Sequence, residues 1–115
     1  MDLRRILVVD DHDPDLRYAD IILKSAAIAE QIVLLHTGEQ ALQYMGGPDA
    51  AHVSLILLDI NMPEMNGFEF LQAYQPLVDQ GLASAPVVML TSSSAEADRQ
   101  SAADFTCVKA TWSSH

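Results

Sequence analysis

Short apolar runs recur along the chain, and segments with helical spacing lie between them. Four nearly continuous runs cover residues 6–9, 32–35, 53–58 and 86–90. Runs of this length that do not alternate with polar residues are typical of strands buried on both faces, as in a parallel sheet. A last apolar patch covers residues 105–112. The pattern therefore predicts a largely parallel sheet.

The segments between these runs have the three- and four-residue spacing of amphipathic helices. We expect Asp13 to cap the first helix and Pro14 to lie in its first turn. Its predicted apolar face comprises Leu16, Ala19, Ile22, Leu23 and Ala26. Residues 37–40, Thr-Gly-Glu-Gln, resemble a capping box before a second helix.

A third helix is predicted after Gly67, with Phe68, Leu71 and Tyr74 on its apolar face. A weaker fourth helix is expected near residues 95–103, after the polar segment 91–94. Strands that alternate with helices predict an α/β fold with a mostly parallel sheet and helices on both faces. The chain of 115 residues corresponds to one domain.

The charge of the chain excludes several classes of partner. Lys and Arg number 6 against 16 Asp and Glu, which gives a net charge of −10. The few cations are scattered, so we expect neither nucleic acid nor membrane surfaces to bind. A single cysteine, Cys107, cannot form an internal disulfide, and the sequence has no apolar run of membrane-spanning length. These features favour a cytoplasmic protein.

Four polar residues lie at the predicted ends of buried strands. Asp10 and Asp11 end the first strand, Asp59 ends the third and Thr91 ends the fourth. Ligands of open α/β sheets bind outside the carboxyl ends of the strands, so these side chains are predicted to share one site. Three neighbouring carboxylates would have raised pKa values unless a cation lay among them. Mg²⁺ prefers oxygen ligands, so it is the cation that we expect at this cluster of carboxylates.

The three segments that carry these residues resemble the signature of two-component response regulator receiver domains. They are VVDD at residues 8–11, LLDINMPEMNG at residues 57–67 and LTS at residues 90–92. The second segment is far more specific than a lone aspartate. The resemblance implies a CheY-like, flavodoxin-like fold, which is a doubly wound, five-stranded parallel sheet in the order 2-1-3-4-5.

The resemblance also implies a role for each residue of the site. Asp59 would accept a phosphoryl group from a histidine kinase or phosphotransfer protein. Asp10 and Asp11 would hold Mg²⁺ together with Asp59 and the backbone carbonyl of Asn61, and the Thr91 hydroxyl would bind the phosphoryl oxygens. Such a stand-alone domain signals through altered protein contacts. It is not an enzyme, although it phosphorylates itself and can slowly lose the phosphoryl group.

The C-terminal segment departs from the family pattern. Receiver domains place a lysine at the end of the fifth strand, and Lys109, the only candidate, lies about four residues too near Thr91. In one alignment Lys109 is that lysine and the fourth helix has lost a turn. In the other, which we favour, the fifth strand spans residues 108–113 and Ser113 or Ser114 stands in place of the lysine, since this gives a strand of ordinary length.

The sequence ends before a fifth helix could form, so we expect a single receiver domain, residues 1–115, that is truncated or atypical after about residue 104. Part of one sheet face would then be uncovered, a candidate patch for dimerisation, helix exchange or aggregation. A degenerate receiver that binds partners without phosphorylation is the main alternative. A remote one is a Mg²⁺-dependent phosphohydrolase with Asp59 as covalent nucleophile, but Asn61 replaces the second acid of such enzymes.

Overall fold

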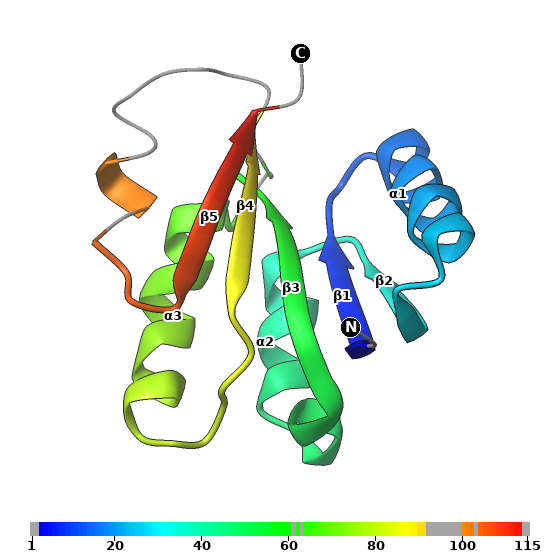
Figure 1. Ribbon diagram of the computed structural model, residues 1–115. Helices are drawn as coiled ribbons and strands as arrows, with labels where there is room; N and C mark the ends of the chain where they lie inside the picture. The colour runs from blue at the N-terminus through cyan, green and yellow to red at the C-terminus, as the bar shows by residue number, and fades with distance from the viewer. Residues whose placement is uncertain (1–2, 61, 63, 92–99, 103, 114–115) are drawn as a thin grey trace.

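Five parallel strands form one sheet in the order β2-β1-β3-β4-β5, which confirms the predicted topology (Figure 1). The structure is a computed structural model that describes residues 3–60, 62, 64–91, 100–102 and 104–113. The strands are β1 (Leu3–Val9), β2 (Ala29–Leu35), β3 (Val53–Asp59), β4 (Val87–Thr91) and β5 (Val108–Ser113). β1, β3 and β4 lie inside the sheet, and each contains a nearly continuous apolar run, as expected of strands that are covered on both faces.

Helices lie on both faces of the sheet. The helices are α1 (Asp13–Ala26), α2 (Gly38–Met45) and α3 (Gly67–Asp79), and a 3-10 turn, η1 (Pro48–His52), leads into β3. In Figure 1, α2 and α3 lie behind the sheet, whereas α1 lies on the other side, next to β1 and β2. Most of the fourth helix expected near residues 95–103 falls outside the described residues.

Alternate residues of β1 build two separate apolar layers. Leu7 and Val9 pack into the larger core under α2 and α3. Ile6 and Val8 pack into a smaller core with Leu16 of α1. All of these β1 side chains are at most 1% exposed. A strand that is buried on both faces is the expected consequence of a continuous apolar run.

The helix ends agree only in part with the expected caps. The N-cap of α1 is His12 rather than Asp13, and its side chain makes no capping hydrogen bond. Asp13 instead pairs with His36, as described below, and Pro14 lies in the first turn as predicted. Thr37 caps α2 by accepting a hydrogen bond from the Gln40 N–H, but Gln40 Oε1 accepts from the His36 N–H rather than from the Thr37 N–H, so only half of the expected capping box is present.

The helix predicted from the apolar spacing is present as α1, but two of the five spaced residues are exposed. Leu16 is buried and Leu23 is partly buried, but Ile22 is 49% exposed and Ala26 is also exposed. Periodicity shows that a residue lies on an apolar side of a helix, but it does not show whether another element covers that side. No helix in the described part of the chain is long and apolar enough to cross a membrane.

Candidate functional site

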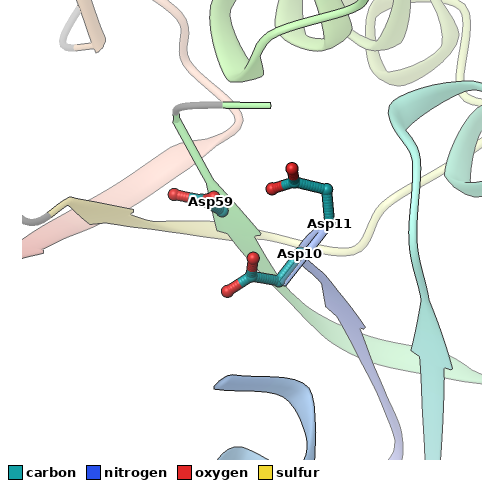
Figure 2. A group of neighbouring side chains, drawn as sticks. All are labelled: Asp10, Asp11 and Asp59. Atoms are coloured by element: carbon teal, nitrogen blue, oxygen red, sulfur yellow. The ribbon is translucent and has the colours of Figure 1, made fainter. Parts of the chain in front are cut away.

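Three aspartates meet at the carboxyl edge of the sheet. Asp10 and Asp11 directly follow β1, and Asp59 is the last residue of β3, the neighbouring strand. Figure 2 shows the three side chains gathered at these two strand ends. One carboxylate oxygen from each residue lies within 4.8 Å of the other two. The fold therefore brings together the acids that the sequence predicted as a cluster.

Asp10 is the most buried member of this cluster. It is only 8% exposed, and its Oδ1 accepts a hydrogen bond of 3.0 Å from the His12 N–H. Burial raises the pKa of Asp10 above the ordinary value of 3.8. The His12 N–H and a hydrogen bond with the Asp59 side chain lower this pKa, whereas the charges of Asp15 and Asp11 raise it. A cation among these carboxylates would favour the charged form.

The cluster fits a hard divalent cation. Mg²⁺ binds oxygen ligands at about 2.0–2.1 Å, so two ligand atoms of one ion lie at most roughly 4.2 Å apart. One carboxylate oxygen of each aspartate lies within 4.8 Å of the other two, so the three oxygens are grouped at a separation near this limit. Asp11 is exposed and Asp59 is half-buried, which leaves the site open to solvent and to a ligand. Asn61, the predicted source of a carbonyl ligand, lies outside the described residues.

The segment after Asp59 is tied back to the strand end by Gly67. The Gly67 N–H donates a hydrogen bond of 2.9 Å to the Ile60 carbonyl. A Cβ atom at Gly67 would lie 2.9 Å from the Ile60 Cα and 3.0 Å from the Asp59 carbonyl oxygen. Only glycine permits so close an approach of two backbone segments. Asn66 and Glu69 form a complete capping box that starts α3 immediately beyond.

The strand register places the remaining predicted residues. Thr91 is the last residue of β4, and Asp59 pairs with Leu90 directly before it. Thr91 pairs with Ser113, the last residue of β5. Lys109 is exposed and lies near the other end of β5. β5 thus spans residues 108–113, as the favoured alignment of the C-terminal segment predicted. Lys109 lies away from the acidic edge.

Two histidines contact aspartates in the first turn of α1, and no local sequence pattern connects His36 with that turn. The His12 Nδ1 lies 3.1 Å from a carboxylate oxygen of Asp15. The His36 Nε2 lies 2.6 Å from Asp13 Oδ1, which joins the end of β2 to the first turn of α1. The exposed position of His36 after a strand was the only available signal. Neither imidazole belongs to the cluster of three carboxylates.

Comparison with known proteins identifies the family. The model of the response regulator receiver domain matches residues 6–110 of the chain. The chain belongs to this family. As a receiver domain, it is a module of two-component signalling, and receiver domains pair with histidine kinases or phosphotransfer proteins. Receiver domains are generally signalling modules rather than classical enzymes.

The two-component response regulator ORR1 of rice is 32% identical over 94 residues, or 76% of the chain. The match covers 39% of ORR1, so the receiver domain spans much less than that whole protein. The phosphorylated cyanobacterial phytochrome response regulator RcpA is similar in structure, with a TM-score of 0.82 at 28% identity over 98% of the chain and 81% of RcpA.

The receiver domain of the Arabidopsis thaliana histidine kinase CKI1, crystallised with Mg²⁺ and BeF3⁻, has a TM-score of 0.83 at 19% identity. That match covers 96% of the chain and 80% of the CKI1 domain. At this level of identity the likeness shows the shared fold.

Proposed function

We propose that Asp59 accepts a phosphoryl group from a histidine kinase or phosphotransfer protein while Mg²⁺ is bound by Asp10, Asp11 and Asp59. The observation that carries the proposal is the cluster of three carboxylates within 4.8 Å at the carboxyl edge of the sheet. RcpA, which is phosphorylated, and the CKI1 receiver, which was crystallised with Mg²⁺, support the same chemistry by analogy. Asn61 remains the predicted carbonyl ligand.

Phosphoryl transfer to Asp59 depends more on the positioning of the reacting atoms than on chemical activation of the carboxylate. A carboxylate oxygen of Asp59 forms a bond to phosphorus while the P–N bond of a donor phosphohistidine breaks, and the released imidazole takes a proton from water. The bound Mg²⁺ supplies positive charge that offsets the repulsion between the carboxylates and the phosphoryl oxygens. Asp59 suits the role of acceptor because the rigid end of β3 holds its backbone while its side chain stays half-exposed.

Thr91 is the candidate for the hydroxyl that binds the phosphoryl oxygens. Its backbone ends β4, in the strand next to the one that ends with Asp59. A contact between this hydroxyl and the phosphoryl group would pull on the segment that follows β4 and change the surface offered to a target protein. The output is then a change of protein contacts, and a cytoplasmic location remains a prediction.

Intact mass spectrometry tests this proposal. The wild type and Asp59→Asn are incubated with acetyl phosphate, once with Mg²⁺ and once with EDTA. We expect a gain of one phosphoryl group only in the wild type with Mg²⁺. Equal labelling of Asp59→Asn would refute the role of Asp59, and equal labelling in EDTA would refute the role of the metal.

A second candidate function is a receiver that binds its partner without being switched. The position of Lys109 favours it, because this lysine lies near the opposite end of β5 from the acidic edge. A folded protein that binds Mg²⁺ but gains no mass from acetyl phosphate would support this function. The same sample would bind its partner equally well before and after incubation.

A further inference from the structure

Asn66 is followed by Gly67, and an asparagine in front of a glycine can lose its side-chain amide without an enzyme. The backbone nitrogen of the glycine gives its proton to solvent and attacks the asparagine Cγ, and the side-chain nitrogen leaves as ammonia. Water then opens the five-membered ring at one of its two carbonyl carbons, which gives aspartate or isoaspartate. Glycine obstructs ring closure least because it has no Cβ. The other asparagine of the chain, Asn61, precedes Met62 and lacks this advantage.

The fold engages both groups that would react. The Gly67 N–H donates a hydrogen bond of 2.9 Å to the Ile60 carbonyl, and Gly67 is buried, so solvent does not reach the proton that must leave. The Asn66 Oδ1 accepts a hydrogen bond of 2.9 Å from the Glu69 N–H. The Asn66 side chain must release this N–H before its Cγ can meet the Gly67 nitrogen. Ring closure therefore requires the first turn of α3 to open.

The Glu69 carboxylate holds this turn closed from the other side. Its Oε1 accepts a hydrogen bond of 3.0 Å from the Asn66 N–H, which completes the capping box. The Glu69 side chain contributes through this contact, whereas its backbone N–H would remain in any variant. Loss of one contact of a helix cap shifts the opening equilibrium by about fivefold. The rate of amide loss should rise by the same factor.

The two products differ in their effect on the fold. Aspartate at position 66 can still accept the Glu69 N–H, and its charge suits a helix N-terminus. Isoaspartate instead carries the main chain through its Cβ and Cγ, which adds one carbon between residues 66 and 67. Gly67 has no space for a shift toward the strand, because even a Cβ would lie 2.9 Å from the Ile60 Cα. The longer chain must therefore move Gly67 outward and break its hydrogen bond with Ile60.

We propose that Asn66 is a site of spontaneous deamidation whose rate is set by the opening of the α3 capping box, and that isoaspartate at this position separates Gly67 from the end of β3. The reaction consumes one water, releases one ammonia and needs no metal or phosphoryl group. It is therefore independent of the function proposed above. Its isoaspartate product loosens the backbone beside Asp59.

Peptide mapping of aged protein tests the first part. The wild type is kept in mildly alkaline buffer, with and without a denaturing concentration of urea, and mass spectrometry with electron-transfer fragmentation separates isoaspartate from aspartate. We expect Asn66 to react at least tenfold more slowly in the folded protein than in urea. Equal rates in the two samples, or no reaction at Asn66 in the folded protein over the period in which the urea sample is consumed many times over, would overturn the proposal.

Three glutamate variants test the role of the cap. Glu69→Ala should raise the rate at Asn66 about fivefold, whereas Glu69→Gln keeps an acceptor for the Asn66 N–H and should change it less than twofold. Glu30→Ala removes the same charge from an exposed position near the start of β2 and should also leave the rate unchanged. Equal rates in Glu69→Ala and the wild type would refute control by the capping box. Circular dichroism verifies that each variant is folded, and the comparison in urea needs no variant.

Urea unfolding of the products tests the second part. Ion exchange isolates the aged wild type that has gained one negative charge, a mixture of aspartate and isoaspartate, and Asn66→Asp provides the pure aspartate form. We expect Asn66→Asp to unfold near the midpoint of the wild type, and the isoaspartate component of the aged fraction to unfold at a clearly lower urea concentration. Identical midpoints for the aged fraction and Asn66→Asp would show that isoaspartate leaves Gly67 in place, which would contradict the proposal.

Discussion

Thr91 and Ser113 lie opposite each other at the carboxyl ends of β4 and β5. Lys109 lies four residues before Ser113, roughly 13 Å back along the strand at 3.3 Å per residue. The register also shifts between Val87 and Val88, whose partners are Val108 and Ala110, so Lys109 is the extra residue of a bulge. The strand end nearest to the acidic cluster therefore carries a serine.

The position of Lys109 leads to a prediction about phosphoryl transfer. Lys109→Ala should change the rate of phosphorylation by acetyl phosphate less than twofold, because the ammonium group is remote from Asp59. Ser113→Lys should bring an ammonium group to the correct strand end and raise phosphorylation by about tenfold, which corresponds to about 1.4 kcal/mol. Intact mass over time measures both rates. A large loss in Lys109→Ala would restore the alignment in which this residue contacts the phosphoryl group.

Gly67 is predicted to be intolerant of a side chain. In Gly67→Ala the new Cβ would press on backbone atoms of Asp59 and Ile60, which cannot turn away as a flexible side chain can. We expect the variant to lose about 1–3 kcal/mol of stability in urea unfolding and to accept phosphate more slowly. At Gly47 the nearest atoms to an added Cβ are 3.5 Å away, an ordinary contact. Gly47→Ala should therefore stay within about 0.5 kcal/mol of the wild type, and a similar loss in both variants would contradict this account.

Much of the fold could be predicted from the sequence because parallel strands need continuous apolar runs. The fifth strand is the clearest case, since the preferred bounds of residues 108–113 are those of β5. The spacing that includes Ile22 and Ala26 predicted the helix but not the exposure of these two residues, because covering depends on a neighbouring element that the local pattern does not contain. The contact between Asp13 and His36 joins residues 23 positions apart, which no local signal predicts.

The cluster of Asp10, Asp11 and Asp59 was predictable for a different reason. Each residue directly follows or ends an apolar strand, and the topology of parallel sheets brings such positions to one edge. The approach of their oxygens to within 4.8 Å and the burial of Asp10 are properties of packing and appear only in three dimensions.

Replacing alanine by glycine should have opposite effects on stability at two neighbouring residues at the end of α1. Ala27 has a φ of 52° in the left-handed region and donates its N–H to the Lys24 carbonyl. Ala27→Gly should stabilise the protein by about 0.5–1 kcal/mol, because glycine adopts this conformation without strain. Ala26→Gly, one residue earlier inside the helix, should destabilise it by about 1 kcal/mol. Thermal unfolding followed by circular dichroism measures both, and changes of the same sign would contradict this assignment of the helix end.

Tyr74 should make stability depend on pH in the alkaline range. Its ring is fully buried, its hydroxyl donates a hydrogen bond of 2.8 Å to the Ala85 carbonyl, and burial raises its pKa from 10.0 to about 12. The folded protein keeps this proton at a pH where the unfolded chain has lost it. The contribution of the protonated Tyr74 hydroxyl to folding stability is therefore complete below pH 10. It is lost as pH rises toward 12, an effect of about 2–3 kcal/mol.

Tyr74→Phe isolates this effect. At pH 7 the free energy of unfolding of the variant should be about 1 kcal/mol lower, because the hydrogen bond to the Ala85 carbonyl is missing. Between pH 9 and pH 12 the variant should lose less further stability than the wild type. Urea unfolding at both pH values gives the comparison. An identical alkaline loss in the two proteins would show that another group is responsible.

We expect Asp59 alone among the three clustered aspartates to accept the phosphoryl group. The most direct test is to treat the protein with Mg²⁺ and acetyl phosphate, reduce it with borohydride, and map the peptides by mass spectrometry. Borohydride converts an aspartyl phosphate into homoserine and leaves free aspartate unchanged. We predict homoserine at position 59 alone, and homoserine at position 10 or 11 with Asp59 intact would contradict the account.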